Sequence, residues 1–110
     1  MSLWLDIGRL EDIPKLGARV VRLPRGDIAV FRTDDDRVFA LDDRCPHRGG
    51  PLSQGIVHGV RVTCPLHNWV VELCDGQAVA PDEGCVAAYP VRVVDGRVSL
   101  EIEAPHEQVA

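Results

Sequence analysis

The sequence predicts an all-β fold class: an antiparallel β-sandwich or partly open barrel with a small lobe inserted near the middle of the chain. Short runs rich in Val, Ile, Leu and Phe recur at regular spacing along the 110 residues. Turn residues separate these runs, and an Asp-Gly pair between two apolar runs, as at Asp95-Gly96, is a strong signal for a tight hairpin. We find no linker or internal repeat, so we expect residues 1–110 to form a single domain.

In the first third of the chain, four apolar runs are broken by Pro24-Arg-Gly-Asp27 and by the acidic turn Thr33-Asp-Asp-Asp36. The segment Glu11–Leu16 is long enough for one turn of helix at most. The strands expected here are Trp4–Ile7, Ala18–Leu23, Ile28–Arg32 and Arg37–Leu41.

The second half of the chain reads as three hairpins, which turn at Gly59, at Asp75-Gly76 and at Asp95-Gly96. The last residues, Glu103–Ala110, have little to bury and read as a frayed tail. Residues 43–84 would form the inserted lobe, within a scaffold made from both ends. The expected strands are Ile56–His58, Val60–Thr63, Trp69–Leu73, Gln77–Ala80, Val91–Val94 and Arg97–Ile102.

The composition excludes several classes of protein. Hydrophobic residues make up 45% of the chain and charged residues 26%, as in ordinary globular domains. The net charge of −5 argues against a nucleic-acid partner. The N-terminus lacks the pattern of a secretory signal, and no run approaches the ~18 apolar residues of a membrane span. We therefore expect a cytoplasmic protein with neither a nucleic-acid nor a membrane partner.

Two short motifs carry the chemistry: Cys45-Pro46-His47 and Cys64-Pro65-Leu66-His67. Together they offer two thiolates and two imidazoles, which suits a metal site better than disulfides in an intracellular protein. A structural zinc site is an alternative, because tetrahedral Cys₂His₂ coordination is common. However, zinc fingers pair Cys with Cys and His with His, whereas each motif here mixes the two.

Each motif continues in a way that resembles a Rieske [2Fe–2S] domain, as Cys45-Pro-His-Arg-Gly-Gly-Pro-Leu52 and Cys64-Pro-Leu-His-Asn-Trp69. The resemblance covers nearly the whole chain and implies a Rieske-type fold that holds a [2Fe–2S] cluster. By this resemblance, Cys45 and Cys64 bind the inner iron, and His47 and His67 bind the outer iron, near solvent. The chemistry implied is one-electron transfer, with glycine backbone N–H groups directed at sulfur and no substrate bound at iron.

Residues that are missing from the motifs indicate a low reduction potential. By the same resemblance, high-potential Rieske proteins of cytochrome bc complexes carry an extra cysteine in each loop, joined as a disulfide, and hydroxyl donors after the second histidine. Gly50 and Leu66 occupy the cysteine positions here, and residues 68–71 have no hydroxyl. We therefore expect a potential of about −150 mV, at the low end for this class of cluster, which suits an acceptor of electrons from a flavin.

Three other side chains need an interpretation. Cys74 and Cys85 lack neighbouring histidines, so we expect buried free thiols, with a Cys74–Cys85 disulfide as the alternative. Trp69 is expected to pack over the cluster and shield it, with electron relay as the less favoured role. His58 reads as a solvated turn residue rather than a ligand.

The second motif resembles the small subunit of assimilatory NAD(P)H-dependent nitrite reductase. The resemblance extends to two later segments, Pro81-Asp-Glu-Gly-Cys85 and Tyr89-Pro-Val-Arg-Val93. This resemblance implies a large subunit with FAD, a [4Fe–4S] cluster and siroheme that reduces nitrite to ammonium. The present chain would be a non-catalytic electron-transfer or structural subunit, and some members of that family lack the ligands. The alternatives are a stand-alone ferredoxin, between a reductase and an aromatic-ring dioxygenase, and a non-redox zinc module.

Overall fold

The computed structural model describes residues 2–24, 26–47, 49–66 and 68–103. These ranges contain two 3₁₀ turns, η1 (Leu10–Asp12) and η2 (Leu52–Gln54). No helix in them has the length and apolar character that crossing a bilayer requires. The strands are β1 (Ser2–Arg9), β2 (Gly17–Leu23), β3 (Gly26–Arg32), β4 (Val38–Asp42), β5 (Ile56–His58), β6 (Arg61–Thr63), β7 (Val70–Glu72), β8 (Ala88–Tyr89), β9 (Val91–Val94) and β10 (Arg97–Glu103).

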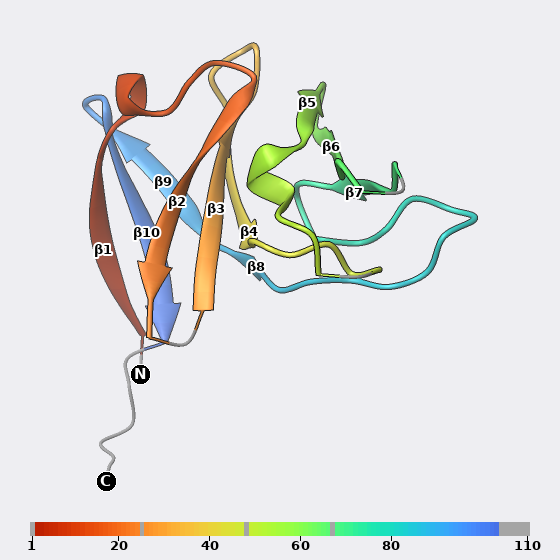
Figure 1. Ribbon diagram of the computed structural model, residues 1–110. Helices are drawn as coiled ribbons and strands as arrows, with labels where there is room; N and C mark the ends of the chain where they lie inside the picture. The colour runs from red at the N-terminus through yellow and green to blue at the C-terminus, as the bar shows by residue number, and fades with distance from the viewer. Residues whose placement is uncertain (1, 25, 48, 67, 104–110) are drawn as a thin grey trace, which may run out of the picture.

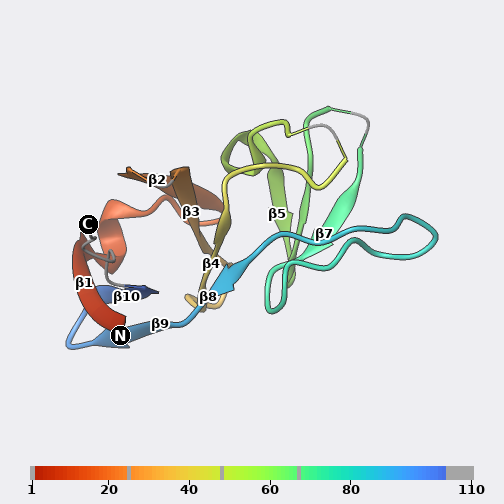
Figure 2. The ribbon, with the colours of Figure 1, turned by 90° about the horizontal axis from the view of Figure 1, so that it is seen from below.

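The strands form three antiparallel sheets, in the orders β1-β10-β9, β2-β3-β4-β8 and β5-β6-β7. The first two face one another and form the scaffold, while β5, β6 and β7 lie to one side (Figure 1). Figure 2 shows the same separation from below. The all-β prediction is confirmed, and the sheets do not close into a barrel. Because β4 pairs with β8, everything between residues 42 and 88 is inserted between two neighbouring strands.

The β9–β10 hairpin turns at Asp95 and Gly96, which have φ angles of 51° and 78°. Positive φ at both central residues is what a two-residue hairpin turn requires, so the Asp-Gly signal is confirmed. The turn also supports η1, because the Leu10 N–H donates to the Gly96 carbonyl over 2.8 Å.

Strand β3 is buried on both faces and separates two hydrophobic cores. Ala29 and Phe31 face the core of the lobe, whereas Ile28 and Val30 face the core between the two scaffold sheets. An uninterrupted apolar run is the sequence pattern of a strand covered on both sides. The lobe core contains Ala29, Phe31, Leu41, Cys45, Leu52, Val57, Val62, Cys64, Val71, Leu73 and Val86. The scaffold core contains Ile7, Ile13, Ile28, Val30, Ala40, Val98 and Leu100.

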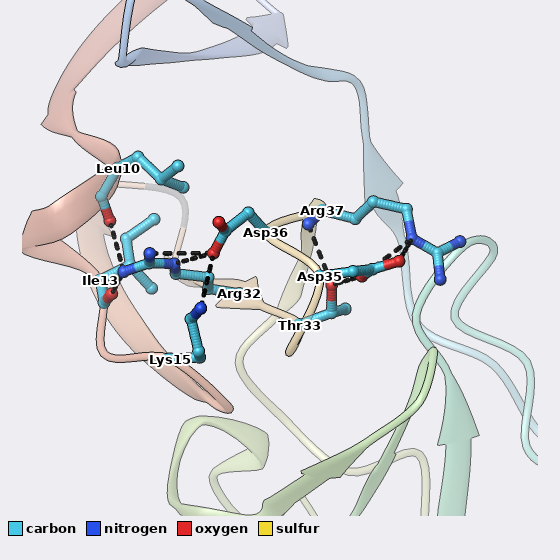
Figure 3. Close-up of polar contacts among 8 residues, drawn as sticks. All are labelled: Leu10, Ile13, Lys15, Arg32, Thr33, Asp35, Asp36 and Arg37. Carbon is cyan, nitrogen blue, oxygen red and sulfur yellow. Dashed lines mark hydrogen bonds and ion pairs between the residues drawn. The ribbon is translucent and has the colours of Figure 1, made fainter.

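Arg32, at the end of β3, fixes the segment between β1 and β2. Its guanidinium donates to the Ile13 carbonyl over 3.0 Å and lies 3.4 Å from the Leu10 carbonyl. It also pairs with Asp36 at 2.9 Å, as Figure 3 shows. This pairing lowers the pKa of the Asp36 carboxyl. One side chain therefore caps the η1 segment and closes the β3–β4 turn.

Several boundaries differ from the sequence prediction. Gln77–Ala80 is not a strand: it makes two isolated bridges, Val71 to Ala78 and Gln77 to Cys85, because two different neighbours share its few hydrogen bonds. The short β8 was not expected, and the helical turn begins at Leu10, earlier than expected. Glu103 ends β10 rather than starting a tail, and residues 104–110 lie outside the described part of the chain.

Candidate metal centre

The first ligand loop leaves β4 and returns to η2 within ten residues. The Cys45 N–H donates to the Gly50 carbonyl over 2.6 Å, and the Gly49 N–H donates to the Cys45 carbonyl over 2.9 Å. Gly49 has a φ of 73°, a left-handed conformation that glycine adopts without strain. These bonds close the loop into a tight turn and bury the Cys45 side chain, which is 3% exposed.

A carboxylate clamps the base of this loop. Asp43 accepts two hydrogen bonds of 2.8 Å from Ser53, one from the backbone N–H and one from the hydroxyl. The Asp43 N–H itself donates to the Asp27 carbonyl on β3 over 3.0 Å. The loop is therefore held at both ends and anchored to the scaffold. Sequence reasoning missed this clamp, although an Asp two residues before Cys45 and a Ser in the turn after it were visible.

The second ligand loop joins β6 to β7. The Cys64 N–H donates to the Trp69 carbonyl over 2.7 Å, which closes the loop across its base. Asn68 has a φ of 59°, a left-handed position that asparagine tolerates better than most residues. His67 lies outside the described residues. Cys64 is fully buried, whereas Leu66, beside it, is 46% exposed at the tip.

The two loops meet at Gly50 and Leu66. A Cβ placed on Gly50 would lie 2.7 Å from the Leu66 Cδ1 and 3.5 Å from the Cys64 Sγ. These are the two positions at which the resemblance implied that the inter-loop disulfide is absent. The absence of a side chain at residue 50 therefore lets the second loop approach the first closely.

The close approach of the loops brings two buried thiols together. Burial raises the pKa of the Cys64 thiol, the backbone N–H of Leu66 bonds to this sulfur and opposes the rise, and the adjacent Cys45 thiol raises the pKa further. Two thiolates held away from water repel one another unless cations compensate their charge. This pair of buried thiols therefore suits a site in which two thiolates bind a metal.

His47 follows Cys45 by two residues and stacks on Trp69. The ring centroids are 4.5 Å apart and the planes differ by 11°. The Nδ1 atom of His47 is buried, so this ring nitrogen faces the protein interior. Within the described ranges no set of three His, Cys, Asp or Glu side chains forms a metal-binding group, so the two sulfurs are brought together but not a full ligand set.

A third segment, which the sequence analysis did not place at the site, covers both loops. A Cβ on Gly84 would lie 3.1 Å from the Pro46 Cβ and 3.9 Å from the Trp69 ring. Gly84 also has a φ of 139°, which side chains rarely adopt. The glycine within Pro81-Asp-Glu-Gly-Cys85 is the sequence signal that marks this segment.

The expectation for the other two cysteines needs correction. Cys74 and Cys85 are free thiols as expected, but both are exposed rather than buried. Cys74 follows the buried Leu73 into the turn after β7, and Cys85 makes a single bridge with Gln77 at an exposed position. Neither belongs to the lobe core. His58 is exposed, as expected for a residue beside Gly59, and its Nε2 lies 2.7 Å from the Thr63 Oγ1.

Comparisons with known proteins agree with this chemistry. A family model described as "Rieske-like [2Fe-2S] domain" matches residues 3–101. The ferredoxin component of the naphthalene 1,2-dioxygenase/salicylate 5-hydroxylase systems of Ralstonia sp. is 31% identical over 101 residues, covering 91% of this chain and 96% of that protein.

Solved structures give the same fold. An NADH-dependent nitrite reductase small subunit from Mycobacterium tuberculosis superposes with a TM-score of 0.83 at 26% identity, covering 94% of this chain and 98% of the other. The E. coli protein NirD superposes with a TM-score of 0.80 at 30% identity, covering 94% and 100%. Both kinds of relative match nearly the whole chain.

Proposed function

This chain belongs to the Rieske-like [2Fe–2S] domain family, and from that membership we propose that it is the electron-transfer subunit of an NAD(P)H-dependent nitrite reductase. The family supplies the coarser part of this statement: the chain is an electron-transfer domain whose cofactor is a Rieske-type cluster. Such a cluster accepts and releases one electron at a time. The nature of the protein partner and the ligand set are our proposal.

We assign Cys45 and Cys64 to one iron and His47 and His67 to the other. The adjacent buried sulfurs of Cys45 and Cys64, and the inward Nδ1 of His47, support this assignment. The N–H group of Leu66 bonds to the Cys64 sulfur, and a donor at this atom stabilises the more negative, reduced state. The surrounding apolar side chains, such as Leu52 and Val62, exclude water from the sulfurs.

The observation that carries the nitrite reductase proposal is the backbone match to the Mycobacterium tuberculosis small subunit over 94% of this chain. The sequence of the second ligand loop, Cys64-Pro-Leu-His-Asn-Trp69, also supports the nitrite reductase proposal. In this role the chain accepts electrons that originate from NAD(P)H and does not itself bind nitrite. A partner that draws on NAD(P)H would also place the chain in the cytoplasm.

The second candidate is a ferredoxin that serves an oxygenase. The 31% identity to the Ralstonia ferredoxin component over nearly the full length of both proteins favours it. The two candidates share the cluster and differ in the protein that docks. The sequence of the neighbouring gene, encoding a siroheme protein or an oxygenase, is the quickest observation that separates them.

The ligand assignment is tested on the chain alone. We expect the anaerobically purified protein to hold two irons, absorb visible light and give a rhombic EPR signal when reduced. Replacing His67→Cys should lower the reduction potential, because a thiolate adds negative charge at the outer iron. His58→Cys is the matched control, since His58 is an exposed histidine of the same lobe. An unchanged spectrum in His67→Cys would contradict the assignment.

The partner is tested by reconstitution. The chain is purified with and without its neighbouring large subunit, and NADH oxidation is measured with and without nitrite. We expect nitrite-dependent oxidation that falls when this chain is omitted. Nitrite-dependent activity that does not change on omission would contradict the subunit proposal, and reduction by a ferredoxin reductase followed by oxygenase turnover would favour the second candidate.

A further inference from the structure

We propose that Trp69 is a positioning residue that fixes the imidazole of the iron ligand His47 by stacking on its face. The inference rests on the proposed ligand role of His47. It goes beyond shielding, because it assigns to one indole the orientation of a ligand that belongs to the other loop.

The geometry of the two rings carries the proposal. Centroids 4.5 Å apart and planes within 11° of parallel mean that the indole packs against one face of the imidazole in an offset stack. In this arrangement the His47 Nδ1 is buried and faces inward. An imidazole can turn about its Cβ–Cγ bond, and that turn would swing Nδ1 away from the interior. A flat neighbour packed parallel to the ring opposes the turn.

Trp69 is itself held firmly enough to act in this way. Its carbonyl accepts the Cys64 N–H over 2.7 Å, and its half-buried ring packs against the lobe core. The segment at Gly84 also approaches the ring, since a Cβ at this position would lie 3.9 Å from the Trp69 Cζ3. The backbone of Trp69 therefore positions a sulfur ligand of one loop, while its side chain positions a nitrogen ligand of the other.

This double attachment links the geometries of the two ligand loops. A shift of the Trp69 backbone would move the Cys64 N–H bond and the His47 stack together. The electron-relay role makes a different prediction, because it requires a redox-active ring and no constraint on the orientation of His47. The two roles separate on replacement by phenylalanine, which keeps a flat face but is much harder to oxidise than indole.

The test uses Trp69→Leu, which keeps apolar bulk without an aromatic face, and Trp69→Phe, which keeps the face. Trp4→Leu is the matched control, because Trp4 is the other tryptophan of the chain and lies on β1 in the scaffold. The Arg92 Cζ lies 4.1 Å from the centroid of its ring. The readouts are the histidine nitrogen couplings in pulsed EPR of the reduced holoprotein and the rate of iron loss to a chelator.

We expect Trp69→Leu to change one histidine nitrogen coupling, leave the other unchanged and speed iron loss by about two- to tenfold, the factor that one aromatic stack is worth. Trp69→Phe should restore the wild-type values, and Trp4→Leu should not differ from wild type. Wild-type couplings in Trp69→Leu, or equal changes in the Leu and Phe variants, would overturn the proposal. A wild-type protein without histidine couplings would instead overturn the ligand assignment.

A measurement on the unmodified protein remains informative if Trp69→Leu fails to assemble a cluster. The reduced holoprotein labelled with ¹⁵N should give a broadened indole N–H signal from Trp69, near the paramagnetic cluster, and a sharp one from Trp4. Broadening of one signal of the two supports the place of Trp69 beside the cluster, which the stack requires. Two sharp signals would overturn it.

Discussion

The scaffold and the cluster lobe hold their loops by different means. In the scaffold, charged side chains hold the β3–β4 turn, as Arg32 does by reaching two carbonyls and Asp36 (Figure 3). In the lobe, backbone hydrogen bonds from Cys45 and Cys64 close the ligand loops, and the side chains that meet there are small or apolar. The exception is the Asp43–Ser53 clamp, which lies at the base of its loop.

This difference follows from what each region has to bury. The scaffold turn at Asp36 borders water, where an ion pair is tolerated and contributes little by itself, whereas the part-buried hydrogen bonds of Arg32 to backbone carbonyls contribute more. The lobe surrounds two adjacent thiols, and a fixed charge packed beside them would disturb the cluster that we propose they bind. We infer that the scaffold folds from its own packing, whereas the lobe gains much of its order from the cluster. The predictions below test this contrast.

The largest effect is expected at the lobe core. Phe31→Ala removes a fully buried ring from the face of β3 that the lobe covers and should lower the free energy of unfolding by about 3–5 kcal/mol. Because the lobe core surrounds both cysteines, the iron content per folded molecule should fall as well. Urea unfolding and iron analysis of the same sample measure both effects.

The control is Leu100→Ala on the scaffold side, a fully buried residue of the other core. It should lower stability by a comparable ~2–5 kcal/mol while the folded molecules keep their iron. If both variants lose iron equally, the two cores are not independent and the contrast between the regions fails.

A second prediction uses the contact between the two ligand loops. The double variant Gly50→Cys with Leu66→Cys should form a disulfide, because a Cβ at residue 50 already lies 3.1 Å from the Leu66 Cγ. Closing a loop of this length should stabilise the protein by roughly 3 kcal/mol. Peptide mapping would identify the bond, and reduction with dithiothreitol should abolish the gain. The Cys64 Sγ also lies within 3.5 Å of that Cβ, so pairing of the residue-50 thiol with Cys64 instead would contradict the prediction.

A third prediction compares the two clamps. Asp43→Ala leaves the part-buried N–H and hydroxyl of Ser53 without their acceptor. It should lower the free energy of unfolding by about 1–3 kcal/mol and speed iron loss to a chelator. Asp43→Asn keeps an acceptor for the Ser53 N–H and should behave nearly as wild type. Arg32→Ala should cost a similar amount and leave iron loss unchanged. Faster iron loss from Arg32→Ala would contradict the separation of the regions.

The smallest effect is expected at Asp6 on the scaffold surface. Asp6 bonds to Arg97 through both carboxylate oxygens, at 2.9 and 3.1 Å, and this pairing lowers its pKa below the ordinary value of 3.8. A lowered folded pKa contributes stability that is present above the unfolded pKa and lost as the pH falls through the folded value. The Tm of Asp6→Asn should therefore lie slightly below wild type near neutral pH and converge with it below pH 3.8. A difference that persists in strong acid would show another cause.

Local signals explain which parts of the fold were predictable. The scaffold strands were predictable because their apolar runs end at strong turn residues. The hairpin at Asp95-Gly96 was predictable because this residue pair readily adopts the positive φ angles that the turn has. Gln77–Ala80 was wrong as a strand because its hydrogen bonds go to two different segments, and nothing within the four residues reveals that. The two-residue β8 is too short to leave a pattern.

The site shows the same limit. The spacing of Cys45, His47, Cys64 and His67 predicted metal chemistry from the sequence alone, because the residue types of a candidate ligand set are local information. The placement of Gly84 over Pro46, the stack on Trp69 and the exposure of Cys85 all depend on how distant segments pack together. The Asp43–Ser53 clamp joins two residues that are ten positions apart, and no periodic pattern in the sequence predicts such a contact.

The burial of β3 on both of its faces has a consequence for protein engineering. If the inserted lobe, residues 43–84, were moved to another protein by itself, it would leave Phe31 and Ala29 behind. The lobe core would then lack the two side chains that β3 contributes to it. A portable module must take β3 and β4 with it, beginning at Gly26, and must offer the opposite face of β3 to a new apolar layer.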